Sequence, residues 1–325
     1  DHYIEVPVDL SKVMFICTAN TLTSIPKPLL DRMEVIEINS YTSPEKLEIA
    51  KRHLLPKQLK IHGLTSKNIR LSSENIMYLI DHYTKESGVR NLERLLGNLC
   101  RKVVREMLET EKKVIYITPQ KIRDYLGQEK YHFDKVSDTP QIGLVTGLAW
   151  TSVGGDTLSI EVNIMKGKGN LELTGQMGNV MKESAKAAVS YIRSNYDVLG
   201  VPENFHTKFD IHIHIPEGAV PKDGPSAGIT MATAIISALT KKPVRNDIAM
   251  TGEVTIRGRV LAIGGLKEKL LAAKRAGIYN VLVPKQNMPH ISEIEKHIVD
   301  EMNIIYVETM EEVIKHAFAH TKEEP

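Results

Sequence analysis

An uncharged run of 17 residues, 224–240, constrains the fold of this chain more than any other segment. It begins with the letters GPSAG, a turn-forming combination that places Ser226 among small residues. Its remaining residues are long enough for a helix, and their Ser and Thr content makes the run a poor membrane span. The sequence therefore predicts a loop that carries Ser226, followed by a helix buried inside a globular domain.

Composition places the chain among ordinary globular proteins. It has 325 residues, of which 42% are hydrophobic and 25% charged, which is enough for two domains and a fragment of a third. Residues 1–134 carry 21 basic and 18 acidic side chains, and the remainder carries 21 and 22. The charge is thus evenly distributed and forms no basic stripe. We therefore expect neither nucleic-acid binding nor attachment to a membrane.

The two cysteines, Cys17 and Cys100, are 83 positions apart. Such sparse usage indicates a reducing compartment and no disulfide scaffold. Neither has a Cys or His neighbour at metal-ligand spacing, so the sequence predicts no metal site and two core cysteines. Residues 1–5 lack the basic start and apolar run of a secretory signal.

The N-terminal residues suggest part of an α/β domain. Residues 12–17 form a continuous apolar run of the kind found in buried parallel strands, and a second short strand is expected at 34–38. A parallel strand needs neighbours, so we expect the earlier strands of that domain to lie outside this chain.

Two further domains follow. Helical patterns begin at Ser43, which we expect to be an N-cap, at 72–76 and at 91–108, and a short strand at 114–117 precedes a last helix at 119. The polar segment 128–140 separates this small helical domain from an α+β domain. There we expect strands at 143–150, 158–165 and 209–215, and helices at 178–196, 228–239, 265–276 and 311–316.

Ser226 and Lys269, 43 residues apart, are the leading catalytic candidates. A serine among glycines leaves room for a substrate carbonyl and for backbone N–H groups that hold an oxyanion. A lysine flanked by Leu266 and Leu270 loses its proton more easily than a solvated one, and can then act as a base. The letters G-x-S-x-G also fit the nucleophile elbow of α/β hydrolases, with Asp247 and His290 as the remaining triad candidates. In an elbow, however, the serine directly follows its strand, and here the strand ends ten residues earlier.

Four motifs carry a family resemblance: PEGA at 216–219, PKDGPSAG at 221–228, TGEV at 251–254 and IGGLKEK at 263–269. In this order they resemble the proteolytic signatures of the Lon family, ATP-dependent serine proteases with a Ser-Lys dyad. The resemblance extends over essentially the whole chain. It implies an α+β proteolytic domain at 141–320, preceded by a remnant of an AAA+ α/β domain at 1–40, an AAA+ helical lid domain at 41–128 and a linker at 129–140. Residues 321–325 are expected to form a disordered tail.

By resemblance, Ser226 is the nucleophile and Lys269 the general base. Thr251 is similar to a threonine that orients the lysine amine, and His214 would have a supporting role near the site. The acidic residues Asp223 and Glu217 would order the serine loop. Peptide cleavage of this kind uses no metal or cofactor.

The resemblance also implies nucleotide-related residues. Asn20 resembles the sensor-1 asparagine, Arg32 the arginine finger and Arg90 the sensor-2 arginine of AAA+ ATPases. No G-x-x-x-x-G-K-[ST] phosphate loop is present, so we expect ATP and Mg²⁺ to act only in the full-length protein.

Three functions remain as hypotheses. The first is a serine endopeptidase that degrades unfolded proteins as part of an ATP-driven hexamer. The second is a catalytically silent Lon-like assembly module, and the third an esterase-like α/β hydrolase. The bacterial cytoplasm is the expected location, with the mitochondrial matrix as the alternative.

Overall fold

The computed structural model describes residues 40–131, 139–151, 154–216 and 222–319, together with residues 7, 9–19, 22 and 25–36. The chain divides into two compact units, residues 1–39 and 40–325. Asn20 and Glu217 lie outside the described residues, as do residues 132–138 of the expected linker and the expected tail.

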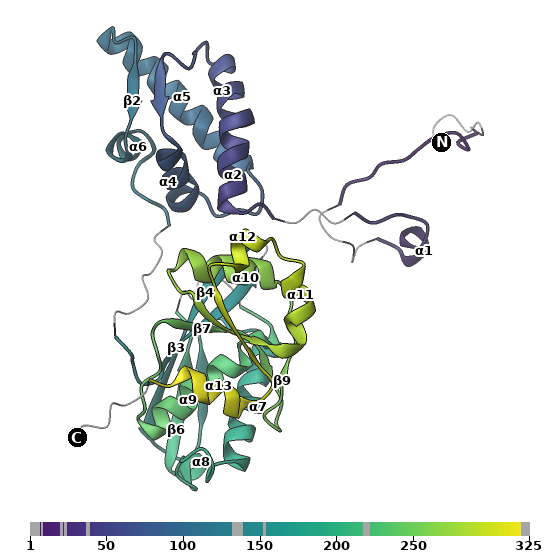
Figure 1. Cartoon of the computed structure of the whole chain (residues 1–325), viewed down its shortest axis with the longest axis vertical. Helices are drawn as coiled ribbons and strands as arrows, with labels where there is room; N and C mark the ends of the chain where they lie inside the picture. Colours follow the sequence, from purple (N-terminus) through teal and green to yellow (C-terminus); the bar gives the residue numbers. More distant parts are fainter. Residues whose placement is uncertain are drawn as a thin grey trace. The chain divides into compact units, whose positions relative to one another are not determined.

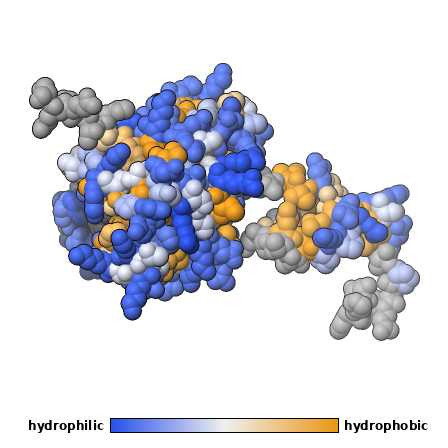
Figure 2. Space-filling model, turned by 90° about the horizontal axis from the view of Figure 1, so that it is seen from below, coloured by the Kyte–Doolittle hydropathy of each residue, from blue (hydrophilic) through white to orange (hydrophobic). Residues whose placement is uncertain are grey.

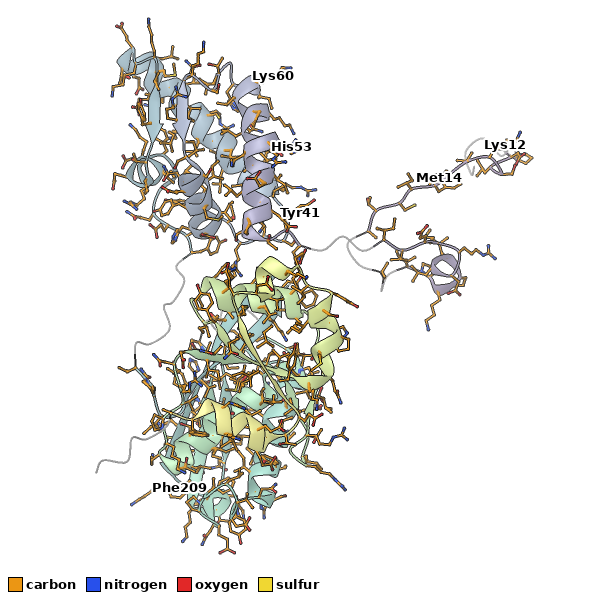
Figure 3. The ribbon with its side chains drawn as sticks, in the orientation of Figure 1. Lys12, Met14, Tyr41, His53, Lys60 and Phe209 are labelled. Atoms are coloured by element: carbon orange, nitrogen blue, oxygen red, sulfur yellow. The ribbon has the colours of Figure 1, made fainter. Side chains whose placement is uncertain are left out.

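The N-terminal unit contains one short helix, α1 (Lys27–Leu30), among its described residues. The strand expected at 12–17 is wrong, because these residues are irregular and Met14 and Ile16 are each 84% exposed. A strand without neighbours leaves its backbone groups without ladder partners, so the apolar run alone does not form one. Cys17 is exposed for the same reason, against the expectation of a core residue. Figure 2 shows orange apolar atoms on the surface of this unit, and the labelled Met14 projects from it in Figure 3.

The helical domain confirms the expected helix pattern (Figure 1). Its elements are α2 (Ser43–Ile49), the π-helical turn η1 (Ala50–Leu54), α3 (Leu55–Ile61), β1 (Ile69–Leu71), α4 (Ser73–Tyr83), α5 (Arg90–Thr110), β2 (Ile115–Ile117) and α6 (Pro119–Leu126). Strands β1 and β2 pair in parallel. Apolar side chains at helical spacing on α4 and α5 fill one core, and Cys100 is buried in it, as predicted.

Helix α2 begins at Ser43, one residue earlier than expected, and its N-cap is likewise one residue earlier. Thr42, not Ser43, is the N-cap: its hydroxyl accepts from the Glu45 N–H, and the Glu45 carboxylate accepts from the Thr42 N–H at 2.7 Å. This reciprocal pair is a capping box. The π-helical turn lies just before Pro56, which has no N–H and whose ring crowds the preceding turn. Exposed His53 and Lys60 project from this helical stretch in Figure 3.

The C-terminal α+β domain is built on a seven-stranded mixed sheet (Figure 1). The strand order is β11-β10-β7-β3-β4-β6-β5, and β4 is antiparallel to both of its neighbours. The strands are β3 (Leu144–Thr151), β4 (Gly154–Lys166), β5 (Leu171–Thr174), β6 (Phe209–His214), β7 (Ile248–Met250), β10 (Asn280–Pro284) and β11 (Asn303–Val307), with a separate hairpin of β8 (Glu253–Val254) and β9 (Val260–Leu261).

Helices cover the sheet from both faces. The larger core joins α7 (Asn179–Ser194), α9 (Gly228–Thr240) and α13 (Met310–Ala317) to one set of strand side chains. The second core joins α10 (Leu266–Arg275), α11 (Met288–Ser292) and α12 (Lys296–Val299) to another set, including Leu148 and Ala249. The remaining helical segments are α8 (Phe205–Lys208), η2 (Pro225–Ala227) and η3 (Lys285–Asn287).

The uncharged run folds as predicted: η2 carries Ser226, and α9 is buried over residues 228–238. Among the described residues, every helix is too short or too polar to span a lipid bilayer.

Candidate active site

Three candidate residues meet beneath the start of α9. The hydroxyl of Thr251 donates to the backbone carbonyl of Ser226 at 3.3 Å, and the amine of Lys269 donates to the Thr251 hydroxyl at 3.1 Å. The N–H of Gly252 reaches the same Ser226 carbonyl at 2.8 Å. Residues from three parts of the sequence therefore hold the Ser226 turn and the Lys269 amine at one place.

The environment of Lys269 favours a neutral amine. Its side chain is 2% exposed, on the face of α10 that also buries Leu266 and Leu270. Burial lowers the pKa of Lys269 from 10.5 to about 8. This shift corresponds to about 3 kcal/mol of lost stabilisation of the charged form. A lysine with this pKa can exist as a free base near neutral pH.

Ser226 is half-buried in the tight η2 turn that leads into α9. In the described part of the chain its hydroxyl makes no direct hydrogen bond with Lys269, whose amine is bound to Thr251 instead. Catalytic hydrogen bonds are often long or absent before substrate binds.

Asp223 orders the serine loop by capping a helix. Its carboxylate accepts from the N–H of Met181 and from that of Gly224, both at 3.0 Å. The first of these donors belongs to the first turn of α7, where N–H groups lack helical partners. The loop is tied to α7 a second time because the Gly178 N–H donates to the carbonyl of Lys222 at 2.7 Å.

Gly224 has a backbone conformation that other residues avoid. Its φ of +135° and ψ of 155° lie in a region that is essentially restricted to glycine. A Cβ added there would meet nothing within 4 Å, so the requirement is conformational and not steric. The glycine before Pro225 is thus part of what shapes the turn that presents Ser226.

The contacts described for His214 include neither Ser226 nor Lys269. His214 and its neighbour His212 both contact the hydroxyl of Thr174 on β5, at 2.7 and 2.9 Å. The supporting role of His214 remains a prediction. Among the described residues, no group of three or more His, Cys, Asp or Glu side chains could hold a metal.

The structure does not favour an α/β-hydrolase elbow. β6 ends at His214, twelve residues before Ser226, and the serine lies in a 3₁₀ turn instead of at a strand end. Asp247 pairs with Arg245 at 2.7 Å, and His290 contacts Asn287 at 3.0 Å. The contacts described for Asp247 and His290 do not include Ser226.

Trp150 is a residue near the site with no role in the dyad. It lies at the end of β3 and is 58% exposed. Its ring lies so close to Gly265, the N-cap of α10, that an added Cβ would come within 2.7 Å of the indole Cγ. Trp150 therefore packs against the start of the helix that carries Lys269.

Two of the three nucleotide-related residues, Arg32 and Arg90, are among the described residues. Arg32 follows α1 in the N-terminal unit, and Arg90 is the first residue of α5; both are exposed. Two arginines are suitable partners for phosphate, but neither the sequence nor the described residues supply a phosphate loop or a carboxylate cluster for Mg²⁺. The described residues therefore do not fit ATP·Mg²⁺.

The fold and this arrangement define a proteolytic domain preceded by an AAA+ lid. Residues 116–320 match the model of the Lon protease (S16) C-terminal proteolytic domain, and residues 60–115 match the Lon protease AAA+ ATPase lid domain. The chain therefore belongs to the Lon protease family, which is a family of peptidases. The family and the mixed helix-and-sheet fold expected from the sequence are confirmed. The domain bounds expected from the sequence stay a prediction.

Curated relatives support the same family. The chain is 55% identical over 325 residues to Lon protease of Clostridioides difficile (strain 630), covering 99% of this chain and 41% of the relative. It is 53% identical over 322 residues to Lon protease 1 of Bacillus subtilis (strain 168), covering 99% and 42%. The chain thus spans about two fifths of the length of these relatives.

Proposed function

We propose that this chain is the proteolytic part of a serine endopeptidase that cleaves through a dyad of Ser226 and Lys269. The observation that carries the proposal is the buried amine of Lys269, held by Thr251 next to the Ser226 turn. A buried lysine with a lowered pKa is the expected form of a general base.

The mechanism has two half-reactions. Neutral Lys269 takes the Ser226 hydroxyl proton while the oxygen attacks the peptide carbonyl, and the resulting ammonium then protonates the leaving amine. This leaves an acyl ester on Ser226. In the second half, Lys269 takes a proton from water, the hydroxide attacks the ester, and the proton returns to Ser226 as the acid is released.

The start of α9 supplies the electrostatic stabilisation of the tetrahedral intermediate. The first N–H groups of a helix have no helical acceptors, and the N-terminal end of the helix dipole is positive. Ser226 lies directly before this end, so N–H groups of the turn can stabilise the oxyanion of the tetrahedral intermediate. Thr251 keeps the amine oriented, and Asp223 keeps the loop ordered.

The wider role is a proposal by family. We infer that the longer protein degrades unfolded proteins as a hexamer, with ATP and Mg²⁺ and with Asn20, Arg32 and Arg90 as nucleotide-related residues. His214 and Glu217 would support the site from the loop and its strand. A bacterial cytoplasmic location is proposed from the bacterial sources of the relatives.

The decisive experiment is labelling by a fluorophosphonate together with hydrolysis of a short unstructured peptide. Wild type is expected to be labelled once and to cleave the peptide, and Ser226→Ala to do neither while it keeps the wild-type circular dichroism and Tm. Ser237→Ala, which removes a buried hydroxyl further along α9, is the control and should keep both activities. Hydrolysis by purified Ser226→Ala would refute the nucleophile assignment.

A further inference from the structure

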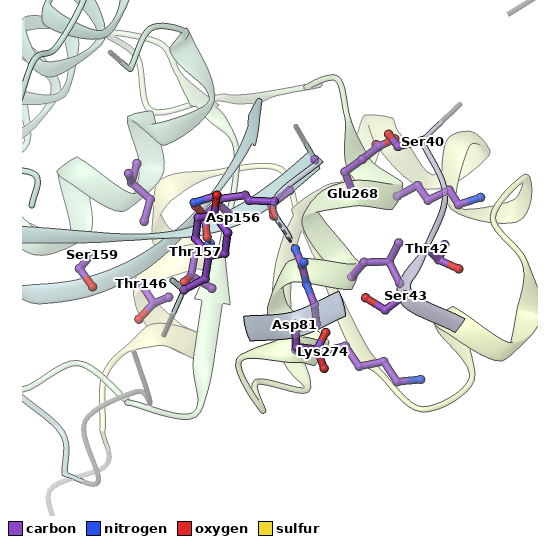
Figure 4. Close-up of a pocket in the computed structure, with 18 of the residues that line it drawn as sticks. Ser40, Thr42, Ser43, Asp81, Thr146, Asp156, Thr157, Ser159, Glu268 and Lys274 are labelled. Atoms are coloured by element: carbon purple, nitrogen blue, oxygen red, sulfur yellow. Dashed lines mark hydrogen bonds and ion pairs between the residues drawn. The ribbon is translucent and has the colours of Figure 1, made fainter. Parts of the chain in front are cut away.

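A cavity of about 760 Å³ lies beside α10, and Ser226 is not among the residues that line it. Its lining comes from the helical domain and from β4 and α10 of the proteolytic domain. Figure 4 shows Asp81, Asp156, Glu268 and Lys274 around it. Glu268 lines this cavity, and the next residue is the buried Lys269. A charged cavity therefore adjoins the helix that carries the proposed base.

The first turn of α10 packs directly on the start of β4. A Cβ added to Gly155 would lie 1.9 Å from the carbonyl oxygen of Glu268 and 3.1 Å from the backbone nitrogen of Lys269. Only a glycine allows strand and helix backbones to approach this closely. The turn of α10 that carries Lys269 is therefore in backbone contact with β4.

Arg275, at the other end of α10, holds the same glycine. Its Nη2 donates to the carbonyl oxygen of Gly155 at 2.5 Å. Gly155 is thus held between the backbone of Glu268 and the guanidinium of Arg275. Arg275 lies on the same helix as Lys269 and does not touch the Ser226 turn among its described contacts.

Charges of the helical domain reach this contact. Asp81, on α4, interacts with Arg275 electrostatically, and Lys85 pairs with Asp156, the residue after Gly155, at 2.6 Å. Lys46, on α2, is buried beside them and donates to the carbonyl of Glu86. Two adjacent residues at the start of β4 are therefore bound by different elements: Gly155 by α10 and Asp156 by the helical domain.

The pKa values of these buried groups depend on one another. Burial lowers the pKa of Arg275, and the carboxylates of Asp156 and Asp81 oppose that effect. Burial raises the pKa of Asp81, and Arg275, His82 and Lys46 oppose it. Burial is the cause of the lowered pKa of Lys269, to which none of the charged groups around it contributes appreciably. Anything that lets water reach Lys269 will therefore raise its pKa.

We propose that Asp81 and Arg275 are positioning residues for Lys269: the helical domain's carboxylate holds the guanidinium on Gly155, which keeps α10 pressed against β4 and water away from the amine. The inference rests on the proposed function of Lys269 as the base. It makes the helical domain a determinant of cleavage rate at neutral pH, although the contacts described for Asp81 and Arg275 do not include Ser226.

The test is the rate at which a fluorophosphonate labels Ser226, by phosphonylation of its hydroxyl with release of fluoride, from pH 6 to 10 in the full 325-residue chain. We expect the midpoint of the pH profile to rise by about one unit in Asp81→Asn and in Arg275→Gln, which lowers the rate at pH 7 about tenfold and leaves it unchanged near pH 10. Arg275→Lys keeps the charge and should be intermediate. The double variant should be no slower than the slower single variant, since both act through one contact.

One control variant and one contrary outcome make the result unambiguous. Lys57→Gln breaks an exposed ion pair with Glu93 elsewhere on the helical domain and should keep the wild-type midpoint. A uniform loss of rate with an unmoved midpoint in Asp81→Asn would overturn the proposal, because a merely structural role lowers the active fraction at every pH. Should Arg275→Gln fail to fold, Asp81→Asn, an isosteric change in a half-buried side chain, decides alone. The base assignment is tested separately with Lys269→Arg. Labelling of that variant at the wild-type rate would show that Lys269 is not the base.

Discussion

The amine of Lys269 lies 3.1 Å from the hydroxyl of Thr251, and that hydroxyl in turn donates to the backbone carbonyl of Ser226. A threonine hydroxyl has one proton and two lone pairs, so it can serve both contacts at once. An ammonium offers three donors and prefers more acceptors than one hydroxyl, whereas a neutral amine is better matched to this site. The contact connects the proposed base to the turn of the proposed nucleophile.

The first prediction is that Lys269 works as a neutral amine. Arginine stays protonated at every accessible pH, so Lys269→Arg keeps the charge but removes the base. It should be as inactive as Lys269→Ala, while the wild-type peptidase rate should rise with pH, with a midpoint near the pKa of about 8, and then level off. Peptide hydrolysis from pH 6 to 10 measures both.

Lys267→Arg is the matched control, because Lys267 lies two positions away and pairs with Glu295 at 2.6 Å. It should keep the wild-type rate and pH profile. An active Lys269→Arg variant would make Lys269 a structural cation and leave the base unassigned.

The second prediction concerns stability. The pKa of Lys269 is lower in the folded chain than in the unfolded one, so between about pH 8 and 10.5 the unfolded chain binds more protons and stability rises with pH. Below pH 8 the folded chain carries the full cost of a buried charge. Lys269→Met, which keeps the apolar bulk, should therefore raise the free energy of unfolding by about 1–3 kcal/mol at pH 7.

Urea unfolding at pH 7 and pH 10.5 checks this prediction. The gain should shrink toward zero at the higher pH, where the lysine is neutral in the folded chain and about half deprotonated in the unfolded one. A variant that is less stable than wild type at pH 7 would show that the lysine contributes more through contacts than its charge costs.

Helices were easier to predict from this sequence than strands. The apolar stripes of α4 and α5 and the uncharged run of α9 each extend over several turns, so periodicity identifies them. β7 is three buried residues, and β10 and β11 are five residues each. Such short apolar runs are compatible with a strand or a helix, and only their neighbours in the sheet decide.

The residues of the candidate site also differ in how well the sequence predicts them. Ser226, Lys269 and Thr251 are predicted because their local motifs are distinctive, and their catalytic roles stay predictions. The sequence predicts no role for Asp81 or Arg275, since a single charged residue on a helix gives no signal until the fold brings two elements together. The apolar run at 12–17 shows the opposite error, because a strand-like pattern does not become a strand without partners.

The third prediction tests the Thr251 contact. Thr251→Val keeps the shape but removes the only described hydrogen-bond partner of a buried amine, which costs about 1–3 kcal/mol. We expect at least a tenfold lower kcat for peptide hydrolysis with little change in KM. Thr251→Ser, which keeps the hydroxyl, should recover most of the rate, and equal rates in the two variants would contradict an orienting role.

The last prediction separates backbone conformation from packing at the serine loop. Gly224→Ala adds a methyl group that meets nothing within 4 Å, so any loss must come from the glycine-only φ of +135°. Strain of this kind costs about 1–3 kcal/mol, and the turn can relieve it by moving Ser226.

Gly63→Ala is the matched control, because Gly63 also has a positive φ, of +68°, and open space around it, but lies in the helical domain. Both variants should lose stability in urea unfolding, while only Gly224→Ala should lose peptide hydrolysis and fluorophosphonate labelling. Wild-type labelling of Gly224→Ala would mean that the turn presents Ser226 without this backbone conformation.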